Sequence, residues 1–363
     1  MTHCQRRDRL AACLAADDLD AVLVSDLVNV RYLTGFTGSN AALLVFPGGD
    51  TPAVLATDSR YRTQAARQAP DLHTVIERAC GRHLVARAVA GGARRIGFES
   101  HVVTVDGFDA LCREVSGGDA ELIRVSGAVE ALREVKDAGE VALLRLACEA
   151  ADAALTQLVD NGGLRPGRTE RAVARELESL MLDHGADGPS FETIVAAGAN
   201  SAVPHHRPTD AVLERGDFVK IDFGAAVGGY HSDMTRTFVL GQAASWQREI
   251  YALVSAAQQA GVEALEPGAE LSGIDGAARR VIAEAGHGEH FGHGLGHGVG
   301  LQIHEAPGIG AAAAGTLRPG SVVTVEPGVY LAGRGGVRIE DTLVVGAKGP
   351  ELLTRFPKDL AIL

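Results

Sequence analysis

The sequence predicts a two-domain protein of the α/β (α+β) class, in which an α/β N-terminal domain precedes a larger domain built from two related halves. A chain of 363 residues normally folds as one to three domains. Up to about residue 125, short apolar runs alternate with helical patterns. Beyond that point, one pattern that ends on a carboxylate occurs twice. We therefore predict domains that span residues 1–128 and 129–363.

The N-terminal domain is predicted to contain a partly parallel sheet, because helical stretches separate most of its strand candidates. A loop at Thr34–Asn40 precedes the second of them. The predicted strands are Ala21–Val24, Ala41–Phe46, Ala53–Ala56, His73–Ile76, Arg95–Phe98 and Glu121–Val125. No cluster of acids, histidines or cysteines in this part suggests chemistry of its own, so we expect a structural or oligomerising role.

A long amphipathic helix is predicted to follow, beginning around Val129–Lys136. Its apolar residues recur at three- and four-residue spacing. These residues are Val141, Leu144, Cys148, Ala151, Leu155 and Leu158. The helix is expected to stop at Asn161-Gly162-Gly163, since glycine is favoured just beyond a helix C-terminus.

The duplicated pattern is a hairpin that carries an acid at the same two positions in each copy. Asp222 ends the first copy of the strand and Glu326 ends the second. Each copy then passes through a pair of glycines to a further acid, Asp233 or Glu340. A hairpin returns its second strand beside the first, so both acids of each copy can lie on one face.

Each hairpin is preceded by a helical pattern, a Pro-Gly turn and another helical pattern. The two turns are Leu164-Arg-Pro-Gly167 and Leu265-Glu-Pro-Gly268. The repeat is too long for a solenoid and has the length of half a domain. We therefore predict that the two copies pack with pseudo-two-fold symmetry and turn their acids towards each other.

Four carboxylates in one interior pocket require cations to neutralise them. A fifth ligand candidate is a histidine of the glycine-rich stretch that contains His293, His297 and His304. This oxygen-rich set suits two divalent ions, most simply Mn²⁺, with Co²⁺, Zn²⁺ or Fe²⁺ as alternatives. The same stretch lacks the Gly-Lys-Ser/Thr ending of a phosphate-binding loop, which argues against that interpretation.

Composition excludes several classes of function. A formal net charge of −12 argues against a nucleic-acid partner. No apolar run approaches the roughly 20 residues that span a bilayer, and no signal-like segment opens the chain. The five cysteines are odd in number and form no Cys-x-x-Cys pair, as expected in a reducing compartment. We expect a cytoplasmic protein with no membrane or nucleic-acid partner.

Several motifs resemble the pita-bread metallopeptidases, and within them the aminopeptidase P and prolidase (Xaa-Pro peptidase) group. They occur in the family's order throughout the second domain. They are Ile221-Asp-Phe-Gly, His231-Ser-Asp-Met-Thr-Arg236, His293-Gly-Leu-Gly-His297, His304-Glu, Val325-Glu-Pro-Gly and Gly336-Val-Arg-Ile-Glu-Asp341. The first domain resembles the creatinase-type N-terminal domain of that group through Asn29–Phe36 and Thr57–Tyr61.

The resemblance implies a role for each site residue. Asp222 would chelate one metal ion, Asp233 and Glu340 would bridge both, and His297 and Glu326 would complete the second. His205 and His304 resemble non-ligand histidines that bind substrate and stabilise the oxyanion, and His293 matches the family pattern with a less defined role. Separately, strand alternation places Arg338 on the face of Glu340, where it could orient the carboxylates.

The predicted activity is that of a metallopeptidase acting on proline-containing peptides as a homodimer, the dimer being implied by the resemblance. We considered three rivals: a metal-free hydrolase of the creatinase kind, a non-catalytic pita-bread binding module and a methionine aminopeptidase. The five metal ligands argue against the first two, and the long N-terminal domain argues against the third.

The choice between Xaa-Pro aminopeptidase and the alternative, Xaa-Pro dipeptidase, turns on one position. Prolidases commonly carry an arginine where this chain has Gly308, and a fixed arginine is the natural partner of the dipeptide carboxylate. The missing clamp and the sequence from Thr34 to Ser39 favour the aminopeptidase. Arg334, or an arginine of a partner subunit, could replace the missing one.

Overall fold

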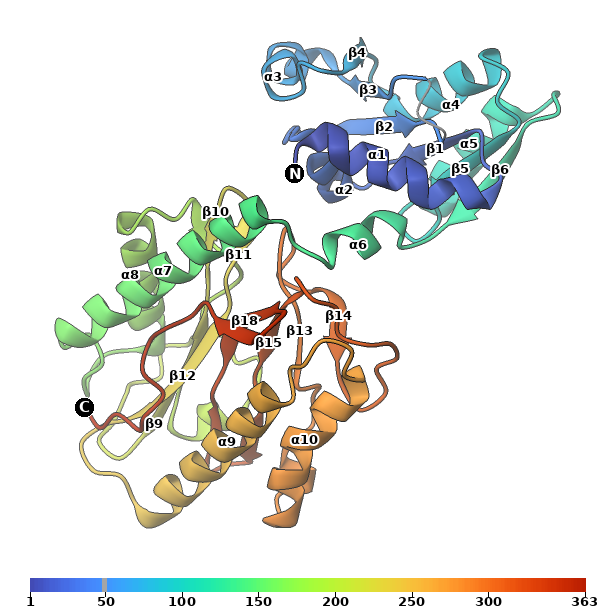
Figure 1. Cartoon of the computed structure of the whole chain (residues 1–363). Helices are drawn as coiled ribbons and strands as arrows, with labels where there is room; N and C mark the ends of the chain where they lie inside the picture. Colours follow the sequence, from blue (N-terminus) through green and yellow to red (C-terminus); the bar gives the residue numbers. More distant parts are fainter. Residues whose placement is uncertain (48–50) are drawn as a thin grey trace. The chain divides into compact units, whose positions relative to one another are not determined.

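The computed structural model of the chain describes residues 1–47 and 51–363. They form two compact units, Met1–Arg133 and Glu134–Leu363 (Figure 1). Within the described residues, no helix is both long enough and apolar enough to cross a membrane. The predicted α/β class and the two-part organisation are both observed.

The division between the units lies beyond the predicted position at 128/129, and the predicted long helix is two helices. Helix α6 (Ala128–Arg133) packs against α1 (His3–Leu14) and belongs to the first unit. Helix α7 (Ala138–Asp160) begins anew because Asp137 caps it. The Asp137 carboxylate accepts from the Gly139 and Glu140 amides, and the Glu140 carboxylate accepts from the Asp137 amide.

The first unit is a six-stranded mixed sheet with the strand order β4-β3-β2-β1-β5-β6. Pairs β1–β5, β5–β6 and β3–β4 are parallel, while β1–β2 and β2–β3 are antiparallel. All six predicted strands occur, with ends shifted by at most one residue. They are β1 (Ala21–Val24), β2 (Ala41–Val45), β3 (Val54–Thr57), β4 (His73–Ile76), β5 (Arg95–Glu99) and β6 (Glu121–Val125).

Helices surround this sheet and supply its core. Helices α4 and α5 bury Leu84, Val85 and Leu111 against strand residues such as Leu23 and Leu44. The helices between the strands are α2 (Leu27–Thr34), α3 (Arg62–Gln68), α4 (Cys80–Ala90) and α5 (Val105–Val115).

The second unit has two halves of the same construction, each with a pair of helices packed on a hairpin (Figure 1). The helices are α7 with α8 (Glu170–Asp183), and α9 (Ser245–Glu263) with α10 (Leu271–Glu284). The strands of the first half are β7 (Gly188–Pro189), β8 (Ile194–Ala197), β9 (Phe218–Phe223), β10 (Ala225–Val227), β11 (Tyr230–His231) and β12 (Met234–Val239). Those of the second half are β13 (Gly296–Gly298), β14 (Glu305–Ile309), β15 (Val322–Val325), β16 (Gly328–Leu331), β17 (Gly335–Arg338), β18 (Asp341–Gly346) and β19 (Gly349–Leu352).

The predicted pseudo-symmetry is present in the backbone. Strands β9 and β12 pair antiparallel around the β10–β11 hairpin, as β15 and β18 do around β16–β17. The glycines of the two Pro-Gly turns have the same left-handed conformation, with φ of 91° at Gly167 and 89° at Gly268. Each half therefore repeats the path of the other, with a separate apolar core beneath each helix pair.

Candidate active site

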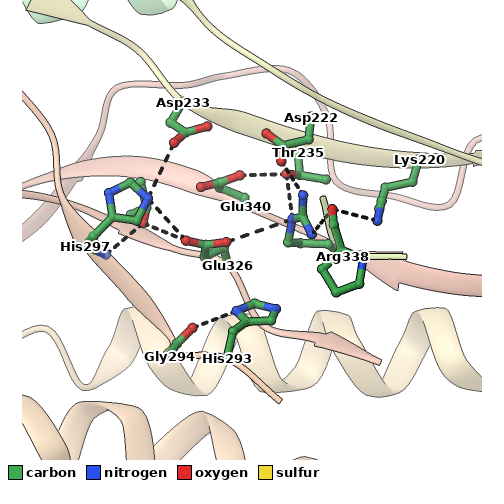
Figure 2. A network of polar contacts seen from close by, with 12 residues as sticks. Lys220, Asp222, Asp233, Thr235, His293, Gly294, His297, Glu326, Arg338 and Glu340 are labelled. Atoms are coloured by element: carbon green, nitrogen blue, oxygen red, sulfur yellow. Dashed lines mark hydrogen bonds and ion pairs between the residues drawn. The ribbon is translucent and has the colours of Figure 1, made fainter. Parts of the chain in front are cut away.

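The four acids of the duplicated hairpins lie close together between the two halves of the second unit (Figure 2). Asp222 lies in β9 opposite Thr235 of β12, and Asp233 directly precedes β12. Glu326 follows β15 and Glu340 precedes β18, at the matching places of the second hairpin. Asp222, Asp233 and Glu340 are each exposed by 7% or less. The predicted convergence is therefore built by equivalent strand ends.

His297 approaches the acids from β13, where glycines on both sides are required. A Cβ atom at Gly296 would collide with the Thr324 carbonyl, and one at Gly298 with the Ala306 carbonyl. His297 Nδ1 lies 3.1 Å from the Gly298 carbonyl oxygen, which can only accept, so Nδ1 carries a proton and donates it. Nε2 then faces the acids, 3.3 Å from Glu326 Oε1 and 3.6 Å from Asp233 Oδ2.

Three of the five predicted ligands form an inner group, and the other two lie towards Arg338. One donor atom from each of Asp233, His297 and Glu340 lies within 4.8 Å of the other two. Asp222 accepts from Arg338 Nη2. Glu326 lies between His297 and Arg338, with Oε1 3.3 Å from His297 Nε2 and Oε2 3.9 Å from Arg338 Nε.

The electrostatics of this group call for additional positive charge. Burial and the charges of Glu340 and Asp222 hold the pKa of Asp233 well above its usual range. Burial and the charges of Glu326 and Asp222 do the same to the pKa of Glu340. Burial opposes ionisation of Glu326 as well, but its hydrogen bond to His297 prevails and lowers its pKa. Arg338 alone therefore does not compensate the acids.

The residues present fit divalent metal ions. Asp222 Oδ1 is buried and has no hydrogen-bond partner among the residues that the structure describes, which is costly unless a ligand binds there. The donors are carboxylate oxygens and one imidazole. This set suits Mn²⁺ or Co²⁺ and does not suit a structural zinc ion, which prefers thiolates. Asp222, Asp233, His297, Glu326 and Glu340 are the residues that would hold such ions.

Arg338 connects the acids to the histidine side of the cavity, as Figure 2 shows in part. It donates to Thr235 Oγ1 at 3.1 Å and to the Tyr330 hydroxyl at 2.8 Å. That hydroxyl lies 2.8 Å from Nε2 of His293, whose Nδ1 donates to the Gly294 carbonyl at 2.9 Å. Both ring nitrogens of His293 are therefore engaged, and its place is at the end of a chain of hydrogen bonds.

His205 and His304 line the same cavity, which has a volume of about 480 Å³. The His304 ring lies edge-on to the His297 ring, with centroids 4.4 Å apart. Burial and the positive charge on His297 lower the pKa of His304, so its imidazole is neutral near pH 7. The structure thus brings all the predicted site residues to one cavity, with His293 and Arg338 bonded to each other through Tyr330.

Lys220 is a site residue that sequence reasoning missed. It is fully buried in β9, and its Nζ donates to the carbonyls of Val203 at 2.7 Å and Pro204 at 3.3 Å. Arg338 Nη1 also donates to the Pro204 carbonyl, at 3.3 Å. Burial and the Arg338 charge lower the pKa of Lys220 to about 6. Together these two side chains fix the backbone that precedes His205.

Sequence reasoning also missed Thr235 and Arg207, and it proposed Arg334 as a carboxylate partner, which lies elsewhere. Thr235 donates to Glu340 Oε2 at 2.6 Å, and Arg207 lines the cavity. Arg334, which was considered as a carboxylate partner, instead stacks over Trp246 at 4.1 Å and does not line this cavity. Gly308 lines a neighbouring hollow and has open space around its α-carbon.

Comparison with known proteins bears on both units. A family model described as metallopeptidase family M24 matches residues 142–347, and one described as creatinase/prolidase N-terminal domain matches residues 6–135. The chain is 35% identical over 344 residues to a Xaa-Pro dipeptidase of Pyrococcus horikoshii, covering 95% of each chain.

Solved structures give the same result over the whole chain. The fold matches that of a Xaa-Pro dipeptidase from Bacillus anthracis, with a TM-score of 0.93, 39% identity and 100% coverage of each chain. It also matches an X-Pro aminopeptidase from Thermotoga maritima, with a TM-score of 0.89, 34% identity, and 98% of this chain and 99% of that one covered.

Proposed function

The chain belongs to metallopeptidase family M24, and we propose that it is a Xaa-Pro dipeptidase that releases proline from the C-terminus of dipeptides. The convergence of four acids and His297 in one cavity is the observation that carries the metallopeptidase activity. The names of the Pyrococcus horikoshii and Bacillus anthracis relatives support the dipeptidase over the aminopeptidase that the sequence favoured.

We propose two divalent ions at this site, with Mn²⁺ as the first choice. When bound, such ions supply positive charge that polarises a carbonyl and activates water at neutral pH. The proline residue explains why a dedicated site is useful, because the Xaa-Pro bond has no amide proton and a fixed φ. General peptidases, which rely on an extended backbone with that proton, handle it poorly.

The chain's own side chains would position the substrate and stabilise charge. A neutral His304 can donate a hydrogen bond to the oxyanion that develops on the attacked carbonyl. His205 would bind the substrate from the loop that follows Pro204. The hydrogen bonds from Lys220 to the Val203 carbonyl and from Arg338 to the Pro204 carbonyl would hold that loop in place. Arg338 would also keep Asp222 oriented towards the ions.

Replacing His304 with alanine is expected to lower kcat by about 10²–10³, the range seen when one oxyanion donor is lost. Metal content should stay at the wild-type level, because His304 is not among the proposed ligands. Elemental analysis of the purified variant, together with steady-state kinetics, checks both points. A variant that loses its metal ions would contradict the assignment of His304 as a non-ligand.

The dipeptidase proposal is tested by comparing Xaa-Pro with Xaa-Pro-Yaa as substrates in the presence of Mn²⁺. We expect kcat/KM to favour the dipeptide by tenfold or more, measured as proline released from one and as free Xaa released from the other. Gly308→Arg should raise this preference further, because the position has room for a side chain and arginine binds carboxylates well. A preference for the tripeptide would contradict the proposal.

The second candidate, a Xaa-Pro aminopeptidase, is favoured by one observation. Gly308 leaves open space where an arginine clamp was expected, so a longer peptide could continue past proline. The Thermotoga maritima structure is called an X-Pro aminopeptidase, which supports the same candidate. The comparison of kcat/KM for Xaa-Pro and Xaa-Pro-Yaa decides between the dipeptidase and the aminopeptidase.

We further propose a homodimer, on the strength of the resemblance described for the sequence, and a cytoplasmic location, because the five cysteines are odd in number and form no Cys-x-x-Cys pair. Light scattering of the purified chain, whose protomer mass is 37.7 kDa, tests the dimer directly.

A further inference from the structure

A dipeptidase needs a positive group that binds the carboxylate of the substrate's proline. Two of the residues that line the cavity are arginines, Arg338 and Arg207. Arg338 is buried and already bonded to Asp222, Thr235 and Tyr330. Of these two arginines, Arg207 is the one with a solvent-exposed side chain, at 82%.

The backbone on either side of Arg207 is anchored from beneath. Glu170, which is fully buried, accepts from His206 Nε2 at 2.8 Å and from the Thr209 amide at 2.9 Å. It also accepts from the Ala197 amide and the Asn200 side chain, both at 2.9 Å. Arg207 therefore extends an exposed guanidinium from a fixed backbone, which limits the entropy lost when it binds a ligand.

Among the described residues, the guanidinium of Arg207 pairs with one acid, Glu192, which also lines the cavity. Its Nε lies 3.0 Å from Glu192 Oε2, and Glu192 is 61% exposed. An exposed pair of this kind is worth little, so a ligand can replace it. Glu192 stands two residues before Ile194, whose partner across β8 and β9 is Asp222. Glu192 therefore lies on the segment that leads into the strand beside Asp222.

We propose that Arg207 is the receptor for the proline carboxylate of a Xaa-Pro dipeptide, and that Glu192 holds its guanidinium at the rim until substrate arrives. This inference rests on the proposed dipeptidase activity. The carboxylate lies about one residue, or ~3.6 Å, beyond the attacked carbonyl, so a long side chain from the rim is needed to meet it. Arg207 would thereby bind the carboxylate in place of the arginine that prolidases commonly carry at the position of Gly308.

The test compares Ala-Pro with its amide, Ala-Pro-NH₂, which has the same shape but no terminal charge. Arg207→Met should raise KM for Ala-Pro roughly tenfold or more, the loss expected for a hydrogen bond to a charged group. kcat should stay within about threefold, and kinetics on the amide should not change. Arg207→Lys should recover part of the loss, because it restores the charge without the planar fork.

Two further variants complete the design. Arg171→Met is the matched control, since Arg171 also pairs with an exposed acid, Asp210, but does not line the cavity. It should leave both substrates unaffected. Glu192→Gln frees Arg207 and should lower KM for Ala-Pro by up to about fivefold, the worth of an exposed ion pair. A rise in KM for both substrates would instead make Glu192 a ligand of the substrate and overturn its role as a holder of Arg207.

Failure of this inference is distinguishable from failure of the proposed function. If the wild-type protein cleaves Ala-Pro but Arg207→Met changes Ala-Pro and its amide equally, or changes neither, Arg207 is not the receptor although the protein is a dipeptidase. If the wild-type protein cleaves tripeptides and leaves Ala-Pro intact, the dipeptidase proposal fails before any variant is measured, and the receptor fails with it.

Discussion

Removal of bound metal is expected to lower hydrolysis of Xaa-Pro substrates by about a thousandfold or more. Divalent ions contribute several kcal/mol of charge stabilisation in such sites, and each 1.36 kcal/mol is a factor of ten in rate. The physical reason lies in Asp233 and Glu340, whose raised pKa values show that the site holds more negative charge than Arg338 offsets.

The measurement is the rate before and after treatment with a chelator, followed by addition of Mn²⁺ or Co²⁺. Activity should return with the metal content determined by elemental analysis. Magnesium added at the same concentration serves as the control, because it is bound less readily by imidazole-containing sites. Full activity in protein shown to be metal-free would refute the metal requirement.

Substitution of a central acid is the second change with a large expected effect. Glu340→Gln or Asp233→Asn removes one charge from the inner group and should lower both metal occupancy and rate. We expect the rate to fall by more than about a hundredfold, since even outer partners of metal ligands cost 10–100-fold. Thr235→Val, which removes a hydrogen bond to Glu340, should show the smaller loss.

The unfolding temperature distinguishes loss of metal binding in Glu340→Gln from misfolding of the variant. A carboxyl group whose pKa is raised by folding destabilises the metal-free protein once the pH passes above its ordinary pKa, since the unfolded chain then ionises more readily. Glu340→Gln removes that cost, so without metal at neutral pH the variant should unfold at a temperature no lower than the wild type. Added Mn²⁺ should raise the unfolding temperature of the wild type and have less effect on the variant.

Much of the fold was predictable because the chain repeats itself. The acids stand at matching places in two copies of one hairpin, and the alternation of strand residues brings them to one face whatever surrounds them. The break before α7 could also have been predicted, since Asp137 and Glu140 form a capping pair in the sequence. The apolar residues that continue through Ala128–Arg133 obscured it.

The remaining residues of the site depend on contacts between distant segments. Arg207 and Glu192 have no motif of their own and meet because the segment before β8 and the loop after Pro204 border the same cavity. In the sequence, Lys220 is a polar residue within a largely apolar strand. Its role depends on the carbonyls of Val203 and Pro204, which only the folded chain brings to its Nζ. Tyr330 becomes important through the single hydroxyl that joins Arg338 to His293.

The most direct test of the account is whether the Mn²⁺-loaded protein releases free proline from Ala-Pro, with Ala-Ala as the comparison substrate and the Glu340→Gln protein as the blank. We predict rapid release of proline, much slower cleavage of Ala-Ala, and neither reaction in the blank. Equal rates on the two dipeptides, or proline release by the Glu340→Gln protein at the wild-type rate, would contradict a proline-specific reaction at this group of acids.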